Sequence, residues 1–256
     1  MILGDSANYQ LPAVVTVPCF SGAPWDLEKL TPLKIFPLKT MHLPEGEDDV
    51  EKYADFVADQ VAELNCYVLV GDSFGAIVSL AFAIRKPSGL CALIMSGGFA
   101  ANPVRSPLLK ARIKAARLLP GPLYRIITLR LHAASLSSPY DAEGQVRWSK
   151  KKSRELFRDN TPYNSYVARA KAALEIDYLD KLDEISVPTL IITPEYDTLI
   201  GEQASQEMLD GIQDVHEVTL KRTGHMLRFS HPVTYADTVM KFLKEKFGDD
   251  LQAACS

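Results

Sequence analysis

The sequence predicts an α/β fold built around a mostly parallel sheet, and three observations support this. Short apolar runs recur along the chain, most of them are continuous, and stretches of helical length separate them. Strands covered by helices on both faces have this continuous apolar character, whereas strands with one face in water alternate. The alternation of strand and helix then indicates a parallel sheet. The predicted strands are Ala13–Val17, Lys34–Phe36, Tyr67–Val70, Ala92–Met95, Thr189–Ile192 and Glu217–Leu220.

Two helices are predicted from their spacing and their ends. The segment Asp49–Leu64 carries apolar residues at helical spacing behind an acidic start, which suits the positive end of a helix dipole. The segment Pro232–Phe247 has proline at its start, one apolar face and lysines near its end. Both helices therefore present one apolar face to the predicted sheet.

The strand pattern disappears from about Ala101 to Ile185, where helical stretches are interrupted by turns that contain proline. This part of the chain also has a different charge. Between Ala101 and Lys171, 15 Lys and Arg stand against 4 Asp and Glu, a net +11, and the remainder has 13 against 28, a net −15. We therefore predict a core of residues 1–100 and 186–256 and a helical insertion of residues 101–185.

Length and composition are those of an ordinary globular protein, with 256 residues, 47% of them hydrophobic, and a net charge of −4. The N-terminus has no basic segment followed by an apolar one, so no secretory signal is expected. No uncharged stretch is an unbroken apolar run of membrane-spanning length, so we expect no membrane span and a cytoplasmic protein. The four cysteines form no Cys-x-x-Cys pair. We expect no metal, no organic cofactor and no nucleic-acid ligand.

The motif Gly71-Asp72-Ser73-Phe74-Gly75 follows one apolar segment and directly precedes another. A Gly-x-Ser-x-Gly motif between a strand and a helix is a nucleophile elbow, which holds its serine on a strained turn above the sheet. The glycines lack the Cβ atoms that would collide with the neighbouring strand and helix. By this motif the chain resembles the α/β-hydrolases across nearly its whole length, and Ser73 is the expected nucleophile. The alternative is an ordinary turn with a helix-capping serine.

A serine nucleophile needs a base, and the base needs an orienting acid. The resemblance favours His225 as the base, because these proteins carry it in a Gly-His before the last helix. It favours Asp197 as the acid, after the strand Thr189–Ile192, with Glu195 as the alternative. The order Ser73, Asp197, His225 is the order of this fold. The competing histidines are His42, His132, His216 and His231, the last of which is expected to cap the final helix.

Two backbone N–H groups are expected to form an oxyanion hole. The first belongs to Phe74, directly after the nucleophile. The second comes from the loop Pro18-Cys19-Phe20-Ser21-Gly22, where the family often has His-Gly-x-x-Gly. Aligning Gly22 and Trp25 with that pattern places the second donor at Phe20, whose side chain would also form a wall of the pocket.

The resemblance implies a serine esterase that cleaves a small-molecule carboxylic ester through an acyl-enzyme on Ser73. A thioesterase, a lactonase and a carbon–carbon hydrolase of the same fold remain open, as does a non-catalytic ligand receptor. The family usually begins with two further strands for which this chain has no room. We therefore expect a trimmed sheet of about six strands with a helical cap.

The insertion corresponds to the family's cap, which roofs the pocket. Its apolar side chains are expected either to face an acyl chain or to pack the cap onto the sheet. The pimeloyl-acyl-carrier-protein methyl ester esterases are similar in architecture and dock an acidic carrier on a basic cap. The basic insertion thus indicates an anionic carrier or surface, or simply a solvated helix face. The apolar residues are Leu108, Leu109, Ile113, Leu118, Leu119, Leu123, Ile126 and Ile127.

Overall fold

The computed structural model describes residues 11–104, 107–108, 111, 115 and 121–248. Its centre is a six-stranded sheet in the order β2-β1-β3-β4-β5-β6, with parallel pairing between all neighbouring strands. The predicted α/β fold with a trimmed sheet of about six strands is therefore confirmed. The strands are β1 (Ala13–Val17), β2 (Leu38–Thr40), β3 (Tyr67–Asp72), β4 (Leu90–Ser96), β5 (Thr189–Tyr196) and β6 (Val215–Gly224).

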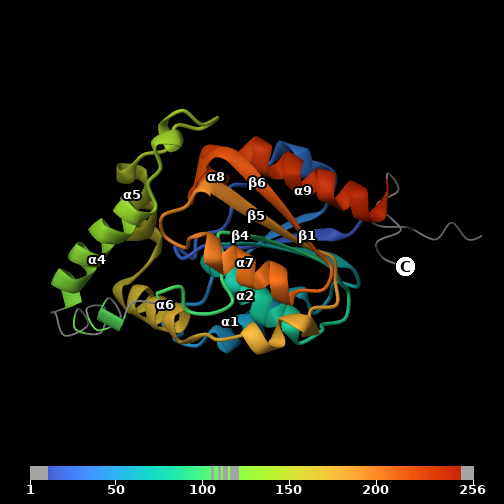
Figure 1. Ribbon diagram of the computed structural model, residues 1–256, viewed down its shortest axis with the longest axis horizontal. Coiled ribbons are helices and arrows are strands. Elements are labelled where there is room, and N and C mark those ends of the chain that lie inside the picture. The colour runs from blue at the N-terminus through green and yellow to red at the C-terminus, as the bar shows by residue number, and fades with distance from the viewer. Residues whose placement is uncertain (1–10, 105–106, 109–110, 112–114, 116–120, 249–256) are drawn as a thin grey trace, which may run out of the picture.

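Helices cover both faces of this sheet (Figure 1). Helices α1, α2 and α7 lie on one face, and α9 lies on the other with the short 3₁₀ helices η1 and η2. Helices α4, α5 and α6 come between β4 and β5 and gather at one end of the molecule. The bounds are α1 (Val50–Val61), α2 (Phe74–Ile84), α4 (Gly121–Ser135), α5 (Lys150–Asn160), α6 (Tyr163–Glu175), α7 (Glu202–Gly211), α8 (Leu227–Ser230), α9 (Pro232–Phe247), η1 (Leu27–Lys29), η2 (Thr31–Ile35), η3 (Pro139–Ala142) and η4 (Leu179–Glu184).

One predicted strand is wrong. The segment Lys34–Phe36 contributes to the end of η2 instead, because Pro32 occupies the first turn of that helix, a position that proline favours. The side chain of Ile35 is 56% exposed, so this apolar run does not enter the sheet. The second strand begins after Pro37, as β2.

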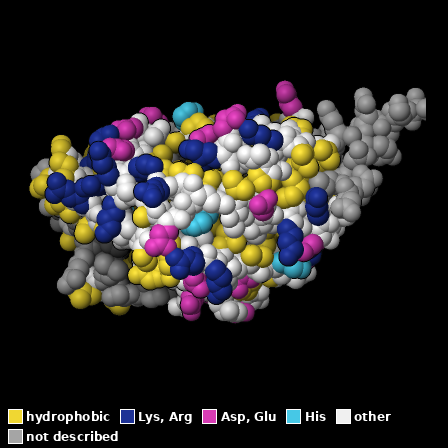
Figure 2. Space-filling model, turned by 90° about the horizontal axis from the view of Figure 1, so that it is seen from above, with side chains coloured by type: hydrophobic (Ala, Val, Ile, Leu, Met, Phe, Trp, Pro, Cys, Tyr) yellow, Lys and Arg dark blue, Asp and Glu magenta, His cyan; other side chains and the backbone are white. Residues whose placement is uncertain are grey.

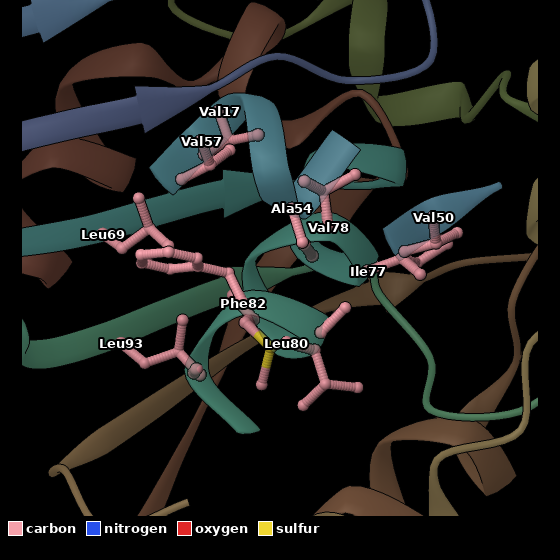
Figure 3. Close-up of a cluster of buried hydrophobic side chains, with 14 of the residues drawn as sticks. Val17, Val50, Ala54, Val57, Leu69, Ile77, Val78, Leu80, Phe82 and Leu93 are labelled. Carbon is pink, nitrogen blue, oxygen red and sulfur yellow. The ribbon is translucent and has the colours of Figure 1, made fainter. Parts of the chain in front are cut away.

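The hydrophobic core has a cluster on each face of the sheet, one against α9 and one against α1 and α2, part of which Figure 3 shows. Every residue of α2 from Phe74 to Ala83 is buried, which explains why its sequence is apolar on all sides. Val57 of α1 and Leu69 of β3 are completely buried in this cluster. Burying one such side chain stabilises the fold by about 1.5–3 kcal/mol. Helix α2 is therefore fixed rigidly against the strand that precedes it.

The surface is unevenly charged. Figure 2 shows Lys and Arg side chains grouped beside hydrophobic ones at the end of the molecule where α4 and α5 lie. Within the described ranges, no helix is long and apolar enough to cross a bilayer. The division into a core and an insertion of residues 101–185 stays a prediction.

Gly75 allows α2 to start against the end of β1. A Cβ atom at this position would lie 2.5 Å from the Pro18 carbonyl oxygen and closer still to that of Val17. We expect Gly75→Ala to lower the free energy of unfolding by at least about 2 kcal/mol, because neither backbone can yield. The helix propensity of alanine acts in the opposite direction by only about 1 kcal/mol. Chemical denaturation measures the difference.

Gly46→Ala is the matched control, because it tests backbone strain without a collision. Gly46 has a φ of 76°, and a Cβ atom there would meet only Asn164, at 3.7 Å. We expect a loss of about 1 kcal/mol from the left-handed backbone alone. Equal stability of the two variants would contradict the importance of the close approach at Gly75.

Candidate active site

Ser73 occupies the sharp turn between β3 and α2. Its backbone has a φ of 56° and a ψ of −116°, a strained conformation for a residue with a side chain. Its N–H donates to the Ser96 carbonyl at 2.7 Å, which ties the turn to β4. The turn places Ser73 at the carboxyl edge of the sheet, where parallel α/β sheets carry their sites.

Ser73, His225 and Asp197 form a hydrogen-bonded chain. The Ser73 Oγ lies 2.9 Å from the Nε2 of His225, and the Nδ1 of His225 lies 2.7 Å from the Oδ2 of Asp197. The Oδ1 of Asp197 accepts the N–H groups of Leu199 and Ile200 at 2.9 and 3.1 Å. These bonds fix the carboxylate, so the imidazole is held with one nitrogen toward the serine.

The pKa values of this pair move in opposite directions. Burial lowers the pKa of His225, but the charge and hydrogen bond of Asp197, with the charges of Asp72 and Asp141, raise it above its usual value of 6.5. Burial raises the pKa of Asp197, but the charge and hydrogen bond of His225 and two backbone N–H groups lower it by more. The pKa of Asp197 therefore lies below its usual value of 3.8. The site therefore favours a carboxylate beside an imidazole that accepts a proton readily.

The other candidates lie elsewhere. Glu195 accepts the Arg222 N–H at 2.7 Å and pairs with Lys221 at 3.1 Å, so it holds the loop and does not contact His225. His231 is the N-cap residue of α9, as expected, and its ring lies 2.9 Å from the Ser230 hydroxyl.

His42 and His216 are both exposed. Among the described residues, no group of three or more His, Cys, Asp or Glu side chains is arranged to hold a metal ion.

A second ionic contact stabilises the turn that carries Ser73. Asp72, which precedes Ser73, accepts from the Nε of Arg228 at 2.8 Å, and both side chains are almost completely buried. The Arg228 guanidinium also lies over the Trp25 ring at 4.1 Å. Removing one partner of such a buried pair costs about 3–5 kcal/mol, since the other charge is left unpaired. The pair joins α8, which directly follows the His225 segment, to the turn.

Gly97 makes room for the base. It follows β4 with a φ of 56°, and a Cβ atom there would lie 2.9 Å from the His225 ring. Sequence reasoning missed both Gly97 and the pair of Asp72 with Arg228. The residue types were visible in the sequence, but their distant neighbours were not.

The cavity beside Ser73 is very small. Its volume is about 10 Å³, room for about one water molecule. Leu136, Phe157 and Phe229 line it. An acyl substrate therefore needs these side chains to move before it can enter. Larger hollows lie elsewhere, and one of about 410 Å³ borders Asp197 without reaching Ser73.

His132 was not selected from the sequence, yet it lines this cavity. Its Nδ1 lies 3.1 Å from the Tyr166 hydroxyl, and its ring stacks on Phe157 with centroids 4.8 Å apart. Burial lowers its pKa to about 3, and the nearby charge of His225 lowers it too. The roof thus contains a neutral imidazole close to the candidate base.

The loop that is expected to complete an oxyanion hole is held from α6. Phe20 lines the cavity, and its carbonyl accepts from the buried Arg169 of α6 at 3.0 Å. Arg169 also donates to the carbonyls of Leu43 and Pro44 and to the Tyr53 hydroxyl. Phe74, the other expected donor, is the first residue of α2, where an N–H has no intrahelical acceptor.

The expected apolar lining of the insertion is wrong for the residues that the structure describes. Leu108, Leu123, Ile126 and Ile127 are exposed on the outer surface and do not line the cavity beside Ser73. The reason is that α4 turns its opposite face inward, where His132 lines the cavity and Leu129 packs against Leu136 and Phe157. The remaining residues of that prediction, at positions 109, 113, 118 and 119, lie outside the described residues.

Comparison with known families gives one match that covers most of the chain. A family model described as serine aminopeptidase, S33, matches residues 40–230. The chain is also 28% identical over 183 residues to a 2-hydroxy-6-oxononadienedioate/2-hydroxy-6-oxononatrienedioate hydrolase of Pseudomonas putida. That match covers 69% of this chain and 62% of the relative. The chain therefore spans less than two thirds of this relative's length.

Solved structures show the same fold at low sequence identity. A hydrolase from Pseudomonas aeruginosa matches with a TM-score of 0.75 and 20% identity, over 93% of this chain and 92% of the other. An enol-lactonase from Burkholderia xenovorans matches with a TM-score of 0.74 and 18% identity, over 92% of each chain.

The raised pKa of His225 can be tested directly. We expect the imidazole protons of His225 to titrate above pH 6.5 in nuclear magnetic resonance spectra of the wild-type protein. Asp197→Asn removes the negative charge and leaves the burial, so the pKa should fall below the wild-type value. Glu195→Gln is the matched control and should leave it unchanged. A fall with Glu195→Gln, or none with Asp197→Asn, would contradict the geometry.

Proposed function

Because the chain belongs to the serine aminopeptidase S33 family of α/β-hydrolases, we propose that it hydrolyses carboxylic esters through an acyl-enzyme on Ser73. The observation that carries this proposal is the hydrogen-bonded chain from Asp197 through His225 to Ser73, beside a small and mostly apolar cavity. The roles of these residues are a serine nucleophile, a general base and an orienting acid.

In the first step, the Ser73 Oγ attacks the ester carbonyl carbon while the Nε2 of His225 takes the serine proton. Asp197 stabilises the imidazolium that forms, which agrees with the raised pKa of His225. The carbon–oxygen bond then breaks, and His225 returns the proton to the leaving alcohol. In the second step, His225 removes a proton from water and the hydroxide attacks the acyl carbon. The bond from that carbon to the Ser73 Oγ then breaks, His225 returns the proton to Ser73, and the acid is released.

The backbone N–H groups of Phe20 and Phe74 would stabilise the negative oxygen in both steps. Phe74 is at the N-terminus of α2, whose dipole favours negative charge. Phe20 belongs to the loop that Arg169 holds by its carbonyl. Such preorganised donors contribute most to catalysis where water is excluded, and the cavity beside Ser73 holds only about one water molecule.

The charge of the cavity supports a neutral substrate. The Pseudomonas putida relative is named for a substrate with two carboxylates. None of the described residues that line the cavity beside Ser73 is Lys or Arg. An aminopeptidase would need a free carboxylate for the substrate amine, but Asp72, the carboxylate in the lining, is paired with Arg228. An uncharged ester avoids both difficulties.

Cleavage of a carbon–carbon bond is the second candidate, because the name of the relative's substrate contains no ester group. A lactonase or a thioesterase would use the same residues in the same order. These reactions differ in the leaving group and not in the steps of Ser73 and His225, so substrate profiling must separate them.

The substrate class is tested with p-nitrophenyl esters of increasing acyl length beside an acyl thioester, a lactone and a 2-hydroxy-6-oxo-dienedioate. We expect the highest kcat/KM with a neutral ester, because the lining offers no cation to a carboxylate. Turnover of the dienedioate without turnover of any ester would move the assignment to carbon–carbon cleavage.

Replacing the proposed nucleophile and base tests the mechanism. Ser73→Ala and His225→Ala should each lower kcat by about 10³-fold or more, because the three residues act as a unit. A fluorophosphonate probe should label the wild-type protein and not Ser73→Ala. His231→Ala is the matched histidine control and should keep most of the rate. More than a tenth of the activity in a folded Ser73→Ala protein would exclude the mechanism.

Phe20→Pro tests the second oxyanion donor. Proline has no N–H, so we expect kcat to fall by about 10²–10³-fold. Phe20→Ala keeps the N–H and should change the preference among acyl chains more than the rate. Circular dichroism shows whether both variants fold. Unchanged turnover in a folded Phe20→Pro protein would place the donor at another residue.

A further inference from the structure

Helix α4 has an apolar face that points away from the protein. Leu123, Ile126, Ile127 and Leu131 are 45%, 51%, 37% and 64% exposed. Their spacing of three and four residues places them along one side of the helix. The other side carries His132, which lines the cavity beside Ser73, and Leu129, which packs against the buried Leu136 and Phe157. We call these four exposed residues the outer face of α4. Together they form one apolar patch, whereas single exposed apolar residues are normal on a protein surface.

Basic side chains lie next to this outer face. The neighbouring helix α5 begins with three exposed lysines, and Arg154 on α5 and Arg130 on α4 are exposed as well. Figure 2 shows the Lys and Arg side chains beside hydrophobic ones at this end of the molecule. The two carboxylates of α5 are engaged already, Glu155 with Lys151 at 3.8 Å and Asp159 with Arg158 at 2.7 Å.

Several of the basic residues are available to a partner. In the part of the chain that the structure describes, Arg130, Lys150 and Arg154 have no ion-pair partner. Their positive charge is therefore not neutralised within the protein. An anionic surface would supply the missing charge.

We propose that the outer face of α4 and the lysines of α5 dock on an anionic lipid bilayer. A bilayer surface accepts both features at once, because apolar side chains enter the boundary of the acyl chains while cations meet the lipid phosphates. The protein then lies on the membrane without spanning it. The docking does not require the proposed hydrolysis, so either can fail alone.

Other occupants fit less well. A second copy placed by two-fold symmetry would bring the unpaired cations of both copies together. An acidic protein would satisfy the cations but would gain less from four large aliphatic side chains on one convex helix. The bilayer is the partner for which both the charge and the apolar side chains are complementary.

The docking would also change the setting of the candidate active site. The inner side of α4 carries His132, which lines the cavity together with the nearby Leu136. The same helix would therefore contact lipid on its outer side and roof Ser73 on its inner side. A substrate that partitions into the bilayer would approach the protein at the helix that closes the cavity.

The test is sedimentation of the protein with vesicles of phosphatidylcholine alone and of equal parts phosphatidylcholine and phosphatidylglycerol. We expect binding to the second composition and weak or no binding to the first. Binding should decrease as salt shortens the Debye length from roughly 10 Å at 0.1 M to roughly 3 Å at 1 M. Equal binding to both compositions, or binding to neither, would overturn the proposal.

Two sets of variants separate the charge from the apolar face. Replacing Lys150, Lys151 and Lys152 by Gln should weaken binding roughly 100-fold at low salt, since one cation near such a surface contributes roughly fivefold. Leu123→Gln with Leu131→Gln should weaken it at least about tenfold.

Matched controls change exposed residues of the same types far from α4 and α5. Ile35→Gln with Val233→Gln, and the replacement of Lys29, Lys241 and Lys244 by Gln, should bind as the wild type does.

The remaining outcomes identify other partners and would overturn the proposal. Loss of binding in the lysine variant without loss in the leucine variant would indicate purely electrostatic adsorption in which the outer face of α4 takes no part. A wild-type dimer in sedimentation velocity that the leucine variant dissociates, without vesicle binding, would indicate an interface between two copies.

Discussion

The structure of the site depends on the absence of a side chain at Gly75. The first turn of α2 passes so close to the carbonyls of Val17 and Pro18 that no Cβ atom fits between them. This contact brings three elements together: the end of β1, the loop that follows it, and the N-terminus of α2. The strained backbone of Ser73 is stable because packing around the turn leaves it no other conformation.

Charge is arranged around this turn in two buried pairs. Asp72 with Arg228 is a fixed ion pair, whereas Asp197 pairs with a His225 that gains and loses a proton on its Nε2 during the proposed reaction. Arg228 pairs with the carboxylate of Asp72, the residue before Ser73. The carboxylate of Asp197 instead hydrogen bonds to the imidazole of His225. The neutral His132 adds no further positive charge above the serine. The surroundings of Ser73 thus agree with the transient imidazolium and the uncharged substrate of the proposed reaction.

Much of this arrangement could be predicted from local sequence patterns. The continuous apolar runs predicted five of the six strands, and the motif around Ser73 predicted the turn, because both depend on neighbouring residues. The resemblance to the α/β-hydrolases, now confirmed by the family match, located Asp197 and His225. The roles of these residues stay a proposal. The strand at Lys34–Phe36 was wrong because Pro32 starts a helix that an apolar run does not reveal.

What could not be predicted depends on contacts between distant parts of the chain. The apolar residues of α4 have the spacing of a buried helix, and nothing local shows that Leu123 and Ile126 point outward. His132 likewise reaches the cavity only because of how α4 packs against distant parts of the chain.

Because of Arg169, helix α6 and the helices α4 and α5 would respond differently to exchange with the corresponding helices of a relative. Its guanidinium lies directly beneath Gly22 and holds carbonyl oxygens of the Phe20 loop and of Leu43. Thr161 adds a hydrogen bond to the Ser21 carbonyl at 3.0 Å. A chimaera that replaced α6 would leave these oxygens without their donors. A graft that ends at Asn160 would instead change α4 and α5 and keep the hydrogen bonds of Thr161 and Arg169 to the loop beside Ser73.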